Sequence, residues 1–176
     1  MPYSFYVTDS FGNRVPVNIR PACQKDFEQT VADHWQTNWT SEFIRNREYK
    51  KYAMEITLTG ELAGLLGYKT LVQDRCLRLI YMEAAPKSNP TLVKPGRRKY
   101  YNIGKAFLAF SVANAMAAGL DGTLSFKAKT TELFYHYRKD FGAIPLGYAP
   151  FELLLLAEDG RTLLEEYYME EVSEDE

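Results

Sequence analysis

The stretch IGKAFLAFSVANAMAAGL, which runs from residue 103 to residue 120, constrains the fold more than any other part of the sequence. It contains 18 residues and one charged side chain, Lys105. Apolar residues recur at spacings of three and four, as at Ile103, Phe107 and Phe110, which predicts an α-helix. A helix with so narrow a polar face needs apolar partners on most of its sides, so we expect it to be buried on a β-sheet.

The rest of the chain supplies strands for such a sheet. Short runs rich in β-branched, aromatic and apolar residues, bounded by Gly, Pro, Asn or Asp, predict strands. Polar starts followed by mixed apolar and polar residues predict helices. In chain order we expect two strands within 3–22, helices over 25–39 and 41–49, strands over 52–59, 62–72 and 77–86, the helix just described, a strand over 122–130, a helix over 131–143 and two strand-like runs within 144–159. This mixed order predicts an α+β (mixed α/β) fold with a largely antiparallel sheet.

Length and composition limit the class of protein. A chain of 176 residues is expected to form one domain, which we place at residues 1–164, before an acidic tail at 165–176. Cys23 and Cys76 lack a second Cys or a His at ligand spacing, so neither a disulfide framework nor a metal site is expected. The absence of a long charge-free apolar run and of a signal-peptide pattern predicts a cytoplasmic protein without a membrane span.

Positive charge is concentrated in one segment. The net charge is −2, but the last twelve residues hold seven acids, and between Glu83 and Asp121 there are six bases and no acid. Three of these bases, Arg97, Arg98 and Lys99, come just before the apolar helix. The acidic tail is interpreted as a solvated end, or as a segment that contacts a basic surface.

The start of the apolar helix has the features of a phosphate-binding site. The first N–H groups of a helix lack partners inside the helix and carry partial positive charge. Asn102 and Gly104 are residues that allow a close turn there, and the three preceding bases add full charges. The alternative is a solvated basic loop in which Asn102 caps the helix.

The segment resembles the pyrophosphate turn of the GNAT family of acyl-CoA-dependent N-acetyltransferases. The strand LIYMEAAP, the basic loop, the pattern K-x-x-N-x-G and a following strand and tyrosine-bearing helix occur in the family's order over about residues 17–156. The family pattern is Q/R-x-x-G-x-G/A, so Lys99 stands for Gln or Arg and Asn102 for the first Gly. The resemblance implies a GNAT-like fold in which a twisted, mostly antiparallel sheet with a splayed strand pair is flanked by about four helices.

The resemblance also implies a donor, a reaction and a set of site residues. The donor is acetyl-CoA and the acceptor a primary amine of an unidentified molecule, which attacks directly in a ternary complex. Glu83 is expected to be the general base and Tyr137, rather than Tyr135, to protonate the leaving thiolate. The residues expected to bind acetyl-CoA are Met82, Ala84, Arg97, Arg98, Lys99, Asn102, Ile103, Gly104 and Lys105.

Other interpretations remain open for the sequence. Glu83 is equally an exposed carboxylate at a strand end, and Tyr137 a core aromatic residue. His34, beside Trp35 and Trp39, is a candidate for the acceptor wall, or its segment only packs the two tryptophans under the sheet. His136 is a candidate for proton transfer, or it is simply exposed. A GNAT-fold module that binds CoA without catalysis is the main alternative function, and a homodimer is a further expectation. Nucleic-acid binding through the basic, tyrosine-containing segment is a third interpretation, which the pI of about 5.8 disfavours.

Overall fold

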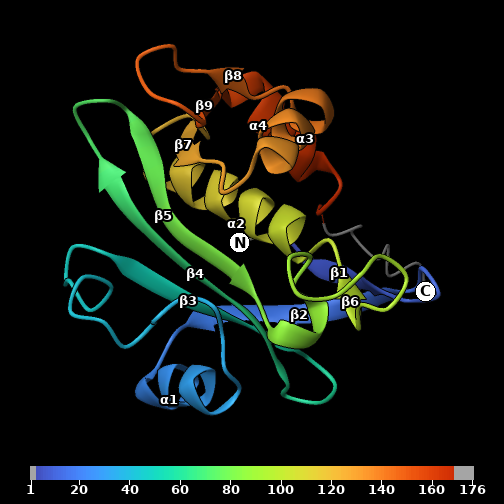
Figure 1. The fold of residues 1–176 in the computed structure, drawn as a ribbon. Coiled ribbons are helices and arrows are strands. Elements are labelled where there is room, and N and C mark those ends of the chain that lie inside the picture. The colour runs from blue at the N-terminus through green and yellow to red at the C-terminus, as the bar shows by residue number, and fades with distance from the viewer. Residues whose placement is uncertain (1–2, 169–176) are drawn as a thin grey trace, which may run out of the picture.

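The computed structural model describes residues 3–168, which form one nine-stranded sheet and four α-helices (Figure 1). The sheet has the strand order β6-β1-β2-β3-β4-β5-β7-β9-β8. The strands are β1 Tyr6–Asp9, β2 Arg14–Pro21, β3 Lys50–Ile56, β4 Leu62–Leu71, β5 Cys76–Ala84, β6 Tyr100–Tyr101, β7 Leu124–Lys127, β8 Ile144–Pro145 and β9 Glu152–Leu155. The helices are α1 Gln24–Ala32, α2 Ile103–Ala117, α3 Thr131–Phe141 and α4 Ala157–Glu165, with a short 3-10 turn, η1, at Pro86–Ser88. The expected α+β class is confirmed.

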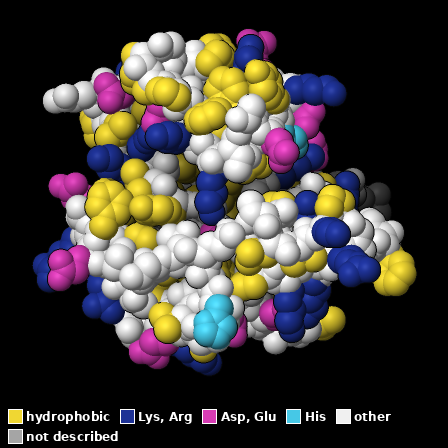
Figure 2. Space-filling model, in the orientation of Figure 1, with side chains coloured by type: hydrophobic (Ala, Val, Ile, Leu, Met, Phe, Trp, Pro, Cys, Tyr) yellow, Lys and Arg dark blue, Asp and Glu magenta, His cyan; other side chains and the backbone are white. Residues whose placement is uncertain are grey.

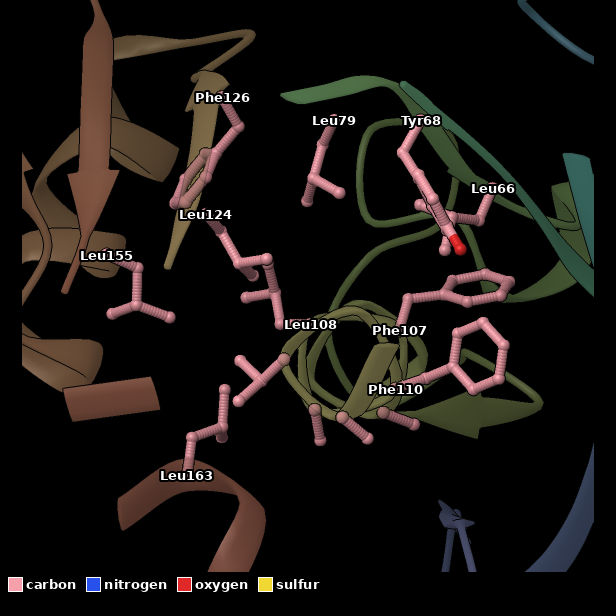
Figure 3. Packing of buried hydrophobic residues seen from close by; sticks show 14 of the residues in the cluster. Leu66, Tyr68, Leu79, Phe107, Leu108, Phe110, Leu124, Phe126, Leu155 and Leu163 are labelled. Atoms are coloured by element: carbon pink, nitrogen blue, oxygen red, sulfur yellow. The ribbon is translucent and has the colours of Figure 1, made fainter. Parts of the chain in front are cut away.

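The apolar helix is α2, and it is buried as its sequence predicts. Its buried residues lie on several sides of the helix axis, and Figure 3 shows that their partners differ. Phe107 points toward Tyr68 of β4, and Leu108 lies toward Leu124 of β7, while Leu163 of α4 approaches α2 from another side. The helix is therefore enclosed by the sheet on one side and by α4 on another, which explains its narrow polar face.

The sheet divides into two halves between β5 and β7. These two strands are parallel but pair only at Leu77 with Leu124 and at Arg78 with Ser125. Just beyond that point the register with β4 shifts, because Tyr68 pairs with Leu79 and Gly67 with Tyr81. The extra residue between them is a β-bulge, which bends a strand and increases its twist. The remainder of β5 diverges from β7, as Figure 1 shows, and the expected splayed pair is present.

The segment after α1 differs from the prediction. The helix expected over 25–39 ends at Ala32, and the one expected over 41–49 is a series of turns. The chain leaves α1 through His34, whose φ of 56° is left-handed and ends a helix. Trp39 and Ile44 are then buried on the side of the sheet opposite α2, and the Ile44 carbonyl accepts from the Lys51 ammonium at 3.0 Å. These tertiary contacts outweigh the weak helical pattern of the segment.

Two further differences concern the edge strand β6 and the start of the expected acidic tail. The edge strand β6, which pairs with β1 at Thr8 and Asp9, was not expected from the sequence. Residues 165–168 were expected to start the acidic tail, but Tyr167 is 1% exposed and its ring lies 4.9 Å from that of Tyr6. The rest of the expected tail lies outside the described residues.

Candidate functional site

The open edge of β5 faces the gap between the two halves of the sheet. The Ala85 amide donates to the Ala63 carbonyl, so residue 85 is hydrogen-bonded to β4. In an antiparallel ladder this bonding alternates along the strand, so the N–H and C=O groups of Met82 and Ala84 point away from β4, toward β7. In residues 3–168, the pairing of β5 with β7 stops at Arg78. The backbone of Met82 and Ala84 is therefore available to an extended ligand.

The N-terminus of α2 lies beside this open edge. Asn102 has φ 66°, the left-handed conformation expected of it, and its side chain donates to Thr8 Oγ1 at 3.1 Å instead of capping the helix. The first hydrogen bond of the helix runs from the Ala106 amide to the Asn102 carbonyl, so the preceding amides are left for another acceptor. A Cβ on Gly104 would come within 3.6 Å of one atom only, Met82 Cε. The helix end is accessible and close to β5.

The four expected cations do not all converge on that helix end. Lys99 forms an ion pair with Glu61 and lies 5.4 Å from the Tyr100 ring, and hydrogen bonding to Glu61 raises the pKa of Lys99. Lys105 pairs with Glu166. The two arginines, in contrast, have no carboxylate partner among the described residues, which leaves their charge available to an anion.

Arg97 and Arg98 differ in how they are held. Arg97 is exposed, while the Arg98 guanidinium lies 5.6 Å from the centre of the Tyr101 ring and its Nε donates to the Val93 carbonyl at 3.4 Å. Figure 2 shows a recess between the two halves of the molecule with basic side chains at its rim. Lys99, with Glu61, instead lines a cavity of about 460 Å³ between α1 and the adjoining ends of β4 and β5. The sequence pattern did not indicate that Lys99 faces this cavity.

The Glu83 carboxylate is buried rather than exposed at a strand end. Its side chain lies on the face of β5 opposite α2, and the residue is 6% exposed. Oε1 accepts from the Gln36 amide at 2.8 Å, and Oε2 accepts from the Thr37 amide at 3.2 Å and from Trp39 Nε1 at 2.8 Å. Its role as a base stays a prediction, and these three donors point to another role, developed below.

The expected acid, Tyr137, lies on α3, and its side chain is buried in the core. It is 9% exposed, and its ring lies 5.0 Å from that of Phe126 in an edge-to-face arrangement. Burial raises the pKa of Tyr137 to about 12. Tyr135 is 59% exposed. The catalytic role of Tyr137 stays a prediction.

The two histidines are both on the surface. His34 is exposed at the turn that ends α1. His136 is exposed on α3, where its Nδ1 lies 2.5 Å from Asp140 Oδ2 one helical turn away. These contacts do not bring either histidine to the open edge of β5.

Comparisons with known proteins agree with this architecture. No family model and no curated protein matches the sequence. Among solved structures, a chimera of the spermidine N-acetyltransferase SpeG from Vibrio cholerae and hSSAT has a TM-score of 0.57 at 9% identity, covering 82% of this chain and 98% of the other. AtaTR bound with AcCoA has a TM-score of 0.56 at 16% identity, covering 84% and 97%. A putative acetyltransferase from Exiguobacterium sp. 255-15 has a TM-score of 0.52 at 16% identity, covering 83% and 97%.

The chain has the GNAT fold. The resemblance read from the sequence is thus confirmed at the level of fold, including the splayed strands and the helix that follows them. In the described part of this GNAT-fold chain, no three His, Cys, Asp or Glu side chains gather in the manner of a metal site. None of its helices from residue 3 to 168 has the length and apolarity to cross a bilayer.

Sequence reasoning missed Gln36, which connects three segments of this GNAT fold. Its side-chain oxygen accepts from Thr91 Oγ1 at 2.8 Å, from Asn89 Nδ2 at 3.2 Å and from Lys129 Nζ at 3.2 Å. Asn89 and Thr91 follow β5, whereas Lys129 follows β7. Because these partners are 53 to 93 residues away in sequence, no local pattern could have identified them.

Proposed function

We propose that this protein transfers an acetyl group from acetyl-CoA to a primary amine. The observation that carries the proposal is the juxtaposition of an unpaired edge at Met82 and Ala84 with an uncapped helix N-terminus at Gly104. An extended amide-containing arm can pair with the strand edge, and a diphosphate can accept from the helix amides. CoA contains both groups in one molecule. The AcCoA-bound neighbour of the same fold supports this choice of donor.

The chain offers separate groups for binding and for chemistry. Arg97 and Arg98 supply charge to the phosphates, whereas Lys99 and Lys105 do so only by leaving their carboxylate partners. The acceptor amine attacks the thioester carbonyl carbon directly, and strand N–H groups near Met82 stabilise the oxygen as it becomes negative.

The tetrahedral intermediate then breaks down by loss of the sulfur. The carbon–sulfur bond breaks, the CoA thiolate leaves, and the Tyr137 hydroxyl gives it a proton. The amine loses its own proton to solvent or to a base, and a proton from solvent returns to the Tyr137 oxygen. The acetylated amine and free CoA are the products.

Calorimetric titration with CoA tests the binding half of this proposal. Gly104→Val should weaken CoA binding at least tenfold, because its branched side chain would occupy the approach to the helix amides, and helix propensity should not suffer. Gly147→Val is the matched control, because a Cβ there meets nothing within 4 Å and the residue lies outside the helices and strands. Both variants should unfold at the wild-type temperature. Wild-type-like binding by Gly104→Val would exclude this helix end as the site.

Release of free thiol from acetyl-CoA in the presence of a panel of amines and peptides tests the catalytic half. Amine-dependent release identifies the acceptor class. Tight CoA binding without release for any amine would favour a non-catalytic CoA-binding module. Salt-sensitive binding to RNA without binding to CoA would favour the nucleic-acid interpretation.

A further inference from the structure

Residues 36–39, which we call the acceptor loop, direct three N–H donors at a single carboxylate. The amides of Gln36 and Thr37 and the indole of Trp39 all donate to Glu83, which lies 44 to 47 residues further along the chain. The loop lies outside every helix and strand. The bond from the indole is buried and those from the two amides are partly buried, and such donors need acceptors, which here come from β5. Glu83 is therefore one of the groups that hold the conformation of the loop.

The same loop connects the two halves of the splayed sheet. The Gln36 side chain accepts from Asn89, beyond the end of β5, and from Lys129, beyond the end of β7. Trp39 is 1% exposed and packs edge-to-face on Tyr81 of β5, with ring centres 6.1 Å apart. The loop thus connects the end of β5 with the end of β7, next to the open edge of β5. It lies on the face of the sheet opposite α2.

The Glu83 carboxylate has little capacity left for a proton transfer. A carboxylate offers about four lone-pair positions, and three N–H donors point at this one. A general base must come within hydrogen-bond reach of the proton that it removes. The three loop donors already lie within hydrogen-bond reach of this carboxylate, and Glu83 is 6% exposed.

We propose that Glu83 is a positioning residue, which fixes the acceptor loop as one wall of the amine-binding site, and that it does not accept the proton of the amine. This rests on the proposed acetyl transfer. Glu83 acts through Gln36, Thr37 and Trp39, so its loss should impair binding of the acceptor more than binding of CoA. The contribution of Lys129 follows from the same arrangement, because it joins the loop to the β7 side of the gap.

The test compares three variants of the full chain. Glu83→Gln replaces one acceptor oxygen with an amide donor, and Trp39→Phe removes one indole N–H. Trp35→Phe is the matched control: Trp35 is also buried, at 8% exposed, but among the described residues its Nε1 has no hydrogen-bond partner. Hydrogen exchange of the Gln36 and Thr37 amides reports on the loop, and steady-state kinetics with an amine from the panel report on its function.

The proposal predicts that the first two variants change the acceptor KM but not the Kd for CoA or the pH profile of kcat. Glu83→Gln and Trp39→Phe should speed exchange of the two amides and raise the acceptor KM about tenfold, as expected for losing a hydrogen bond to a charged group. The Kd for CoA and the pH profile of kcat should stay as in the wild type. Trp35→Phe should change neither the exchange nor the acceptor KM.

Other outcomes would overturn the proposal or the function on which it rests. Unchanged amide exchange in Glu83→Gln, together with a fall in kcat of about 10²–10⁴-fold and loss of the acidic limb of the pH profile, would make Glu83 the base. Failure of the wild type to bind CoA would remove the proposed function, and with it the acceptor role. The exchange measurement would even then decide whether Glu83 holds the loop.

Discussion

Gly64→Ala should destabilise the protein and disturb the N-terminus of α2. Gly64 lies on β4 directly opposite Ala84 of β5, beneath α2. A Cβ at this position would lie 2.7 Å from Phe107 Cε2, 3.1 Å from Ile103 Cγ2 and 3.1 Å from the Glu83 carbonyl oxygen. Phe107 is fully buried and Ile103 is 4% exposed, so neither has free space into which to move.

The size of the effect follows from the cost of overpacking a core. Relief of the contact requires α2 to move away from the sheet at its first turn, for which about 1–3 kcal/mol of unfolding free energy is the usual cost. For a domain of this size each kcal/mol lowers the Tm by about 2–4 °C. Because Gly104 lies in the same turn, the displacement should also weaken CoA binding.

Gly67→Ala on the same strand is the control. A Cβ there would meet only Lys51 Cγ at 3.9 Å and Trp39 Cζ3 at 4.0 Å, which are ordinary contacts. The substitution should therefore be neutral, or should stabilise by about 0.4–1 kcal/mol by restricting the unfolded chain. Urea unfolding and calorimetric CoA titration of both variants provide the measurements. Equal stability of the Gly64→Ala and Gly67→Ala variants would refute the argument that Gly64 sets the distance between α2 and the sheet.

Three further predictions concern other contacts. Hydrogen bonding to Arg78 lowers the pKa of Glu152 below its usual value of 4.5, although burial opposes the shift, so the stability from this pair is present above about pH 4.5 and is lost as the pH falls through the lowered pKa. In Glu152→Gln, the unfolding free energy from urea titrations should fall less steeply as the pH is lowered from 6. If it falls with pH as steeply as in the wild type, the pair contributes nothing to stability. Tyr137→Phe should lower kcat by about 10²–10⁴-fold and leave the Kd for CoA near wild type, and full activity in the thiol-release assay would exclude it as the acid. Gly142→Ala should cost about 1–2 kcal/mol, since φ is +70° and a Cβ would lie 2.6 Å from Asp159 Oδ1, and thermal unfolding at the wild-type Tm would contradict this.

Much of the architecture was predictable because its signals are local. The strands on both sides of the Gly60 turn, the strand that ends before Pro86, and the helix α3 all follow from residues within a few positions of one another. The cap of α3 is Thr130 rather than Thr131, the first residue of the predicted helix. The left-handed conformation of Asn102 also follows from its residue type and from the helix that begins after it. The segment over 33–49 failed the same reasoning, because Gln36, Thr37 and Trp39 have hydrogen-bond partners far away in sequence.

The sequence by itself determined that the apolar stretch 103–120 forms a helix that must be enclosed by a sheet, and that Asn102 and Gly104 form a close turn at its start. Those properties depend on backbone preference and on the side chains of one segment. Only the tertiary structure decided that Lys99 pairs with Glu61, that β5 leaves β7 after Arg78, and that Glu83 meets three donors of a distant loop. A hydrogen bond or ion pair forms only when folding brings two groups to within about 3 Å. Residue type shows that Glu83 is able to accept a proton or a hydrogen bond, but the neighbours that folding places around it determine which of these it does.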